Sequence, residues 1–171
     1  MKTLLLILLI IPFNPFAQCD TEAADKLLKA KEPNAARKLY SKILKKEPTC
    51  YKALMGRANA YYDLQDYTPS LIDYTNAIKI KDNDPMAYAL RGGVYFVIKN
   101  YEMAIADFTK MIELDEKHSA YGYFMRGLSK SVLPVEDVSG ACADFKRAKE
   151  LGWVMDVKGL NEYCNATDLE D

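Results

Sequence analysis

The sequence lacks the side chains and motifs on which most enzyme chemistry depends. Its 171 residues contain one histidine, His118, so a histidine-activated nucleophile has almost nothing to be built from. No GxxxxGKS/T or GxGxxG segment is present, which removes the usual phosphate-binding loops. Carboxylates are plentiful, but each candidate pair is better explained as helix-surface charge. We therefore expect a protein that is not an enzyme and holds no cofactor.

Metal ions and nucleic acids are also disfavoured as ligands. None of the four cysteines belongs to a CxxC motif, and His118 lies far from them in the sequence, so we expect no metal site. The 23 basic and 24 acidic residues give a formal net charge of −1. A nucleic-acid surface would need Lys and Arg gathered on one face, so we expect no nucleic-acid partner.

The first seventeen residues form a separate segment. Lys2 precedes an unbroken apolar run from Leu4 to Ile11, and Pro12 to Ala17 end it. This layout is typical of a secretory signal peptide, and the run is much shorter than the roughly 20 residues of a membrane-spanning helix. Residues 1–17 are therefore predicted to be a signal peptide of a secreted or periplasmic bacterial protein, and no membrane span is expected.

The position of signal cleavage leaves two alternatives open. Cleavage after Ala17 would give a mature chain that starts at Gln18, with a formal net charge of −2 after the loss of Lys2. A lipid on Cys19 would instead tether the protein to a membrane. Gln18 disfavours this second route, because lipid-attachment signals prefer a small residue there.

An exported chain reaches an oxidising compartment, where an even number of cysteines favours disulfides over metal ligation. Pairing by sequence neighbourhood joins Cys19 to Cys50 and Cys142 to Cys164.

A pattern recurs along the chain with a period of about 34 residues. Tyr61 is followed by Tyr95, and Tyr74 by Phe108. Such a period indicates units that cannot bury their hydrophobic faces alone and must stack on one another. Each unit is predicted to contain two amphipathic helices, since apolar residues recur at helical spacing. These helices are expected at about 21–30, 51–64, 69–81, 86–98 and 103–114, with a last unit from about 119, an enlarged turn at 133–140 and a terminal helix at 155–164.

The segments that repeat resemble the tetratricopeptide repeat family, whose units have the same length of about 34 residues. The segments at 58–62 and 92–96 match its first helix, and those at 104–108 and 141–145 match its second. The resemblance covers about residues 20–151. The ending, with Leu151-Gly152-Trp153 and two cysteines, looks like secreted bacterial members.

This resemblance implies an all-α, right-handed α-solenoid of antiparallel helix pairs, with about three and a half to four repeats. The repeat domain would span residues 18–151, and residues 152–171 would form a capping helix and an acidic tail. An arginine and an aspartate recur in three units, so we interpret them as structural ion pairs that fix helix register. These residues are Arg57, Arg91 and Arg126 with Asp73, Asp107 and Asp144.

The resemblance also implies that the first helix of each unit lines a concave, partner-binding groove. The candidate residues are Met55, Asn59, Tyr62, Met86, Phe96, Val97, Tyr121 and Phe124. Some family members grip an acidic chaperone tail there with Lys, Asn and Arg side chains, and Asn59 occupies one of these positions. The other positions hold Met55, Leu90, Tyr121 and Met125. We therefore expect an apolar peptide or amphipathic helix instead. The alternative is that the chain's own terminal segments cover part of this surface.

Overall fold

The computed structural model describes residues 19–133, 137–154 and 163–164, and the part it describes contains helices and no strands. Most helices begin and end within about two residues of the predicted positions. In chain order they are α1 (Glu22–Lys29), α2 (Pro33–Lys46), α3 (Tyr51–Asp63), α4 (Tyr67–Ile80), α5 (Pro85–Val97), α6 (Tyr101–Leu114), the short 3₁₀ helix η1 (Glu116–His118), α7 (Ala120–Ser131) and α8 (Val138–Glu150).

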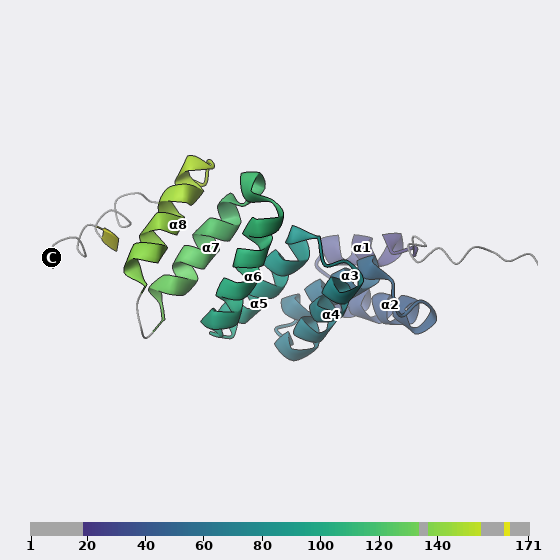
Figure 1. The fold of residues 1–171 in the computed structure, drawn as a ribbon. Helices are drawn as coiled ribbons and strands as arrows, with labels where there is room; N and C mark the ends of the chain where they lie inside the picture. The colour runs from purple at the N-terminus through teal and green to yellow at the C-terminus, as the bar shows by residue number, and fades with distance from the viewer. Residues whose placement is uncertain (1–18, 134–136, 155–162, 165–171) are drawn as a thin grey trace, which may run out of the picture.

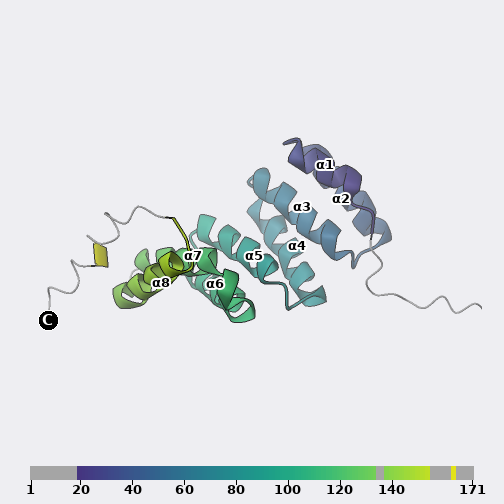
Figure 2. The same cartoon turned by 90° about the horizontal axis from the view of Figure 1, so that it is seen from above.

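The helices form four pairs that follow one another along a single array. Each helix packs against its neighbours in sequence, both within a pair and from one pair to the next. Figures 1 and 2 show the array, with the helix axes turning between the α1–α2 end and the α7–α8 end. The predicted all-α solenoid of helix pairs is confirmed. The predicted cap at 155–164 lies mostly outside the described residues, although Tyr163 and Cys164 are helical.

The turn inside each of the first three pairs has the same geometry. Lys31, Gln65 and Lys99, each one repeat after the last, take positive φ angles of 62°, 60° and 62°. In the second pair the Gln65 N–H donates to the carbonyl of Tyr62 at 2.8 Å, which satisfies one of the open carbonyls at the helix end. The fourth pair differs, because its turn runs from Val132 to Asp137 and residues 134–136 are not described.

Small and aromatic residues let the helices approach closely. Tyr74 and Phe108 are almost fully buried, as their place in the repeat predicts. A methyl group at Gly127 would meet the ring of Phe145 at 2.9 Å, so this glycine is required by the contact between α7 and α8.

The contact between one helix pair and the next, which we call a junction, contains a repeated ionic bridge. In the second junction Arg91 binds Asp107 through two hydrogen bonds of 2.8 and 2.7 Å, and its third nitrogen donates to Thr75 of the preceding pair at 3.1 Å. The hydrogen bonds to Asp107 raise the pKa of Arg91. The other junctions have the same bridge, formed by Arg57 with Asp73 and Ser41 and by Arg126 with Asp144 and Thr109.

The predicted ion pairs are therefore present and connect three helices each. The hydroxyl partners, which the sequence analysis missed, carry the same periodic signal, because Ser41, Thr75 and Thr109 follow one another at intervals of one repeat.

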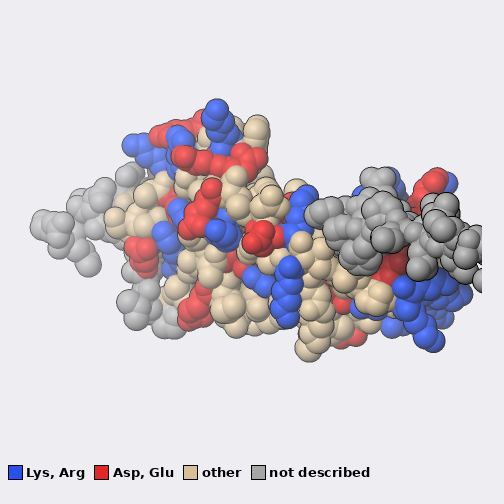
Figure 3. Space-filling model, turned by 45° about the vertical axis from the view of Figure 1, so that its right-hand side comes forward, with Lys and Arg blue, Asp and Glu red and all other residues tan. Residues whose placement is uncertain are grey.

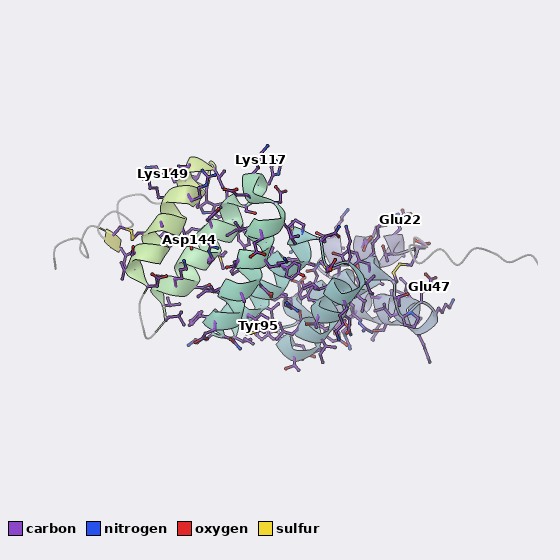
Figure 4. The ribbon with its side chains drawn as sticks, viewed as in Figure 1. Glu22, Glu47, Tyr95, Lys117, Asp144 and Lys149 are labelled. Atoms are coloured by element: carbon purple, nitrogen blue, oxygen red, sulfur yellow. A yellow bond between two sulfur atoms is a disulfide. The ribbon has the colours of Figure 1, made fainter. Side chains whose placement is uncertain are left out.

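The predicted cysteine pairing is also found. Cys19 is bonded to Cys50, with Cα atoms 6.0 Å apart, and Cys142 to Cys164, with Cα atoms 5.8 Å apart. Figure 4 shows a sulfur–sulfur bond at each end of the array, the first of them near the labelled Glu22 and Glu47. The first bond ties the segment before α1 to the start of α3, and the second ties α8 to the C-terminal segment.

Candidate partner-binding surface

The eight predicted groove residues all lie on the first helices of their pairs. Met55, Asn59 and Tyr62 are on α3, where Met55 is half-buried against the core. On α5 and α7 they are Met86, Phe96, Val97, Tyr121 and Phe124. Whether all eight line one concave groove stays a prediction.

Three of these residues expose apolar surface. The exposed fractions are 39% for Tyr62, 56% for Met86 and 41% for Val97. Phe96 is half-buried, with its ring 5.5 Å from the ring of Tyr101, the first residue of the following helix. These exposed side chains on α3 and α5 are the part of the predicted groove that is open to a partner.

The C-terminal end of the predicted groove is covered by Trp153. Gly152, with a φ of 88°, turns the chain after α8. The ring of Trp153 then stacks on Phe124 at 5.3 Å and lies 5.7 Å from the ring of Tyr121. Aromatic contacts of this kind take part of the Phe124 and Tyr121 rings out of a partner's reach. At α7, Trp153 thus contacts two of the predicted groove residues, and coverage of the groove by the chain's own terminal segments stays an alternative.

Asn59 is already used inside its own pair. Its side-chain oxygen accepts a hydrogen bond from the hydroxyl of Tyr74. The first pair has the same contact one repeat earlier, where Tyr40 donates to Asp25 at 2.5 Å. Burial raises the pKa of Tyr74, with smaller contributions from Tyr62 and Asp63, so the phenol stays protonated and keeps donating.

Tyr121 links α7 to the open part of the surface. A methyl group at Gly93 of α5 would meet the Tyr121 hydroxyl at 3.9 Å. Burial raises the pKa of Tyr121, and the electrostatic influence of Tyr62 adds to this effect. Tyr121 thus reaches from α7 to α5 beside Gly93.

His118 and Asp115 form an exposed pair between α6 and α7. His118 lies 2.9 Å from Asp115, and its side chain is 82% exposed. Across the described residues, no group of three or more His, Cys, Asp or Glu side chains is placed to hold a metal ion. Within the same residues no helix is long and apolar enough to cross a bilayer.

No protein-family profile matches the chain. Among curated proteins it is similar to DnaJ homolog subfamily C member 7 of Mus musculus, with 28% identity over 146 residues, which is 85% of this chain and 28% of that protein. It is also similar to serine/threonine-protein phosphatase 5 of Homo sapiens, with 32% identity over 80 residues, 47% of this chain and 16% of the phosphatase. The chain thus spans less than a third of the length of these relatives.

Solved structures share the fold at low sequence identity. MamA (residues 41 to the end) from Desulfovibrio magneticus RS-1 superposes with a TM-score of 0.78 and 19% identity, over 89% of this chain and 88% of that one. The first tetratricopeptide repeat domain of Spaghetti (RPAP3), bound to the HSP90 peptide SRMEEVD, gives a TM-score of 0.63 and 21% identity over 69% and 93%. YrrB, described as a tetratricopeptide repeat protein with an unusual peptide-binding site, gives 0.67 and 19% over 75% and 65%.

Proposed function

We propose that this chain, which has the tetratricopeptide repeat fold, is a non-catalytic protein-interaction scaffold. It is exported from the cytoplasm through the segment at 1–17 and holds a peptide or protein segment against α3, α5 and α7. The observation that carries the proposal is the exposed apolar surface on consecutive first helices, chiefly Tyr62 and Met86. Support also comes from two structures of the same fold, one bound to a peptide and one with a peptide-binding site.

The chemistry of the surface favours an apolar segment over an acidic tail. Met55 and Leu90 are half-buried apolar side chains that pack on the core. The ring of Tyr121 packs against the rings of Phe108 and Trp153. A peptide carboxylate needs Lys, Arg or Asn donors in such positions. Asn59 is the one such side chain at these positions, and its oxygen is bonded to Tyr74. An apolar peptide or the apolar face of a helix would instead bury Tyr62, Met86 and Phe96.

Site-specific photo-crosslinking would test this proposal in the native envelope. A photoreactive residue at Met86 should capture a defined partner, identified by mass spectrometry. The same residue at Met103 is the matched control, because Met103 is 42% exposed but lies on the second helix of the pair. Equal capture from both positions would contradict the proposed surface. Met86→Glu should weaken capture by about tenfold without changing helicity, which corresponds to about 1.4 kcal/mol.

Phe96→Ala and Tyr121→Ala are two further variants of this surface. Because Tyr121 packs between Phe108 and Trp153, its removal would disturb the fold as well as the surface. Phe96→Ala removes a half-buried ring with one aromatic contact, to Tyr101, and is the cleaner of the two. Trp153→Ala gives the opposite test: if Trp153 competes with the partner, its removal should strengthen capture while lowering the unfolding temperature.

The second candidate is a lipid-tethered envelope component that assists assembly or secretion. The disulfide weighs against it, because a lipid thioether would need the Cys19 sulfur that is bonded to Cys50. The mass of the mature protein separates the two candidates. A mass that matches residues 18–171 with two disulfides would rule out the lipid, whereas an acylated N-terminus at Cys19 would establish it.

A further inference from the structure

The first junction contains a cleft on the side of the second helices, away from the surface proposed above. Its volume is about 370 Å³. The lining comes from α2, α3, α4 and the loop after α2, and consists of Ser41, Leu44, Lys45, Pro48, Leu54, Arg57 and Asn76. The floor is apolar, and the walls carry a guanidinium, an ammonium and an amide.

The cleft lies where one aromatic residue of the repeat is missing. In the second junction Tyr88 lies 5.8 Å below the Arg91 guanidinium, and in the third Tyr123 lies 5.3 Å below that of Arg126. The equivalent position in the first junction, one repeat before Tyr88, is Leu54. Within the described ranges no ring stacks on Arg57, whose side chain remains 22% exposed. A partner's ring can occupy the place that the chain fills itself elsewhere.

The helix beside this cleft is strongly basic. α2 carries five Lys or Arg residues and no acidic residue. Lys38, Lys42, Lys45 and Lys46 are exposed, and none of them forms an ion pair with another described residue. Figure 3 shows Lys and Arg side chains gathered at the end of the array where α2 lies. This charge attracts an acidic segment to the opening of the cleft.

We propose that the cleft between α2 and α4 is a second docking site, and that it binds an acidic protein segment through an aromatic side chain. The partner's ring takes the place of the missing tyrosine under the Arg57 guanidinium, between Leu44 and Leu54. Its neighbouring carboxylates pair with Lys45 and the other free lysines of α2. The site is distinct from the surface on α3, α5 and α7, so two partners, or two segments of one, can be held at once.

The repeat itself supplies the variants that test this site. Leu54→Tyr should fill the cleft with a ring of the chain itself, placed as Tyr88 is in the second junction. There the Tyr88 hydroxyl donates to the carbonyl of Asp82. The residue one repeat before Asp82 is Pro48, whose carbonyl could accept in the same way. Lys45→Glu reverses the charge of the lysine that lines the cleft. Lys79→Glu is its matched control, since Lys79 is the exposed residue one repeat later, on α4 in the filled second junction.

Binding can be measured by fluorescence anisotropy with a labelled peptide in which one tyrosine is flanked by glutamates. Wild-type protein should bind with a Kd below about 1 mM. Leu54→Tyr should weaken binding more than about tenfold and Lys45→Glu about fivefold, whereas Lys79→Glu and Met86→Glu should leave it unchanged. Circular dichroism and thermal unfolding show whether each variant is folded. If Leu54→Tyr does not fold, Lys45→Glu still tests the site.

Three results would overturn the proposal. The first is a wild-type Kd weaker than about 1 mM, and the second is equal loss of affinity in Lys45→Glu and Lys79→Glu. The third is equal binding of a peptide in which alanine replaces the tyrosine, because only a general attraction between the lysines and any polyanion would then remain. A failed crosslink at Met86 would contradict the proposed surface on α3, α5 and α7 but not this site. Failure of the peptide to bind would contradict this site but not that surface.

Discussion

The first junction and the two that follow are built on the same ionic bridge but are closed by different means. In the second and third, Tyr88 and Tyr123 stack under the bridging arginine. In the first, a cleft stays open over Leu54 and a disulfide between Cys19 and Cys50 ties the helix pairs together. The first junction thus combines an open cleft with a covalent bond between its helix pairs, whereas the second and third are closed by aromatic packing.

The residue before α3, α5 and α7 shows the same divergence. All three residues occupy equivalent positions of the repeat. Cys50 carries the disulfide, Asp84 accepts hydrogen bonds from the hydroxyl of Tyr51 and the N–H of Met86, and the hydroxyl of Ser119 donates to the carbonyl of Asp115. The same position of the repeat therefore makes a covalent contact at Cys50, a charged contact at Asp84 and a neutral contact at Ser119.

The largest effect is expected from removing a bridging arginine. Arg91→Ala would leave Asp107 buried with its negative charge unpaired, which typically costs about 3–5 kcal/mol. Arg57→Ala should cost less, because its side chain is more exposed and water can reach the space it leaves, through the cleft. Urea unfolding of both variants measures the difference. Equal losses would show that the open cleft does not weaken the bridge.

The next effect is expected from the disulfide of the first junction. Replacing Cys19 and Cys50 together should cost about 3.7 kcal/mol, from the loop-entropy estimate for a bond between cysteines with a sequence separation of 31. The loss should be concentrated in α1 and α2, because these helices lie within the loop. Hydrogen exchange can check this, with protection falling in α1 and α2 but not in α5 and α6. A uniform loss of protection would contradict the view that the bond serves this junction.

A smaller effect is expected from opening the second junction. Tyr88→Leu copies Leu54 and should cost about 1–3 kcal/mol, since it removes the ring under Arg91 and the hydrogen bond to the carbonyl of Asp82. If the missing ring alone makes the cleft, the variant should also gain affinity for the acidic tyrosine peptide. A folded variant with no such gain would show that the basic charge of α2 is also required.

The sequence predicts much of the scaffold, because its information is periodic. The three arginines and three aspartates recur in register, and the structure pairs them as expected. The cysteine pairing follows from sequence neighbourhood and is also found. The same periodicity could have revealed the cleft, because comparing Leu54 with Tyr88 and Tyr123 shows the missing ring.

Contacts made by residues after the last repeat cannot be predicted from the periodicity of the sequence. Trp153 lies beyond α8, and only the folded chain shows that it turns back on Phe124 and Tyr121. The family pattern predicts the place of the groove residues on a helix but not their neighbours. Exposure of Met86 and burial of Tyr121 depend on what the rest of the chain covers, and this is decided by tertiary packing.

The smallest expected effect concerns Asp84, which replaces the disulfide cysteine at the second junction. Burial opposes its ionisation, but hydrogen bonds from Tyr51, Lys81 and the Met86 N–H hold its pKa below the usual value. A lowered folded-state pKa stabilises the fold above the unfolded value of about 4, and this stabilisation is lost as pH falls through the folded value. Asp84→Asn keeps the N-cap and removes the charge. The wild type should therefore exceed the variant in unfolding free energy at pH 7, by less than about 1 kcal/mol, and the gap should close below about pH 4. A gap that stays constant from pH 7 to pH 3 would mean that hydrogen bonding, and not the charge, holds this junction.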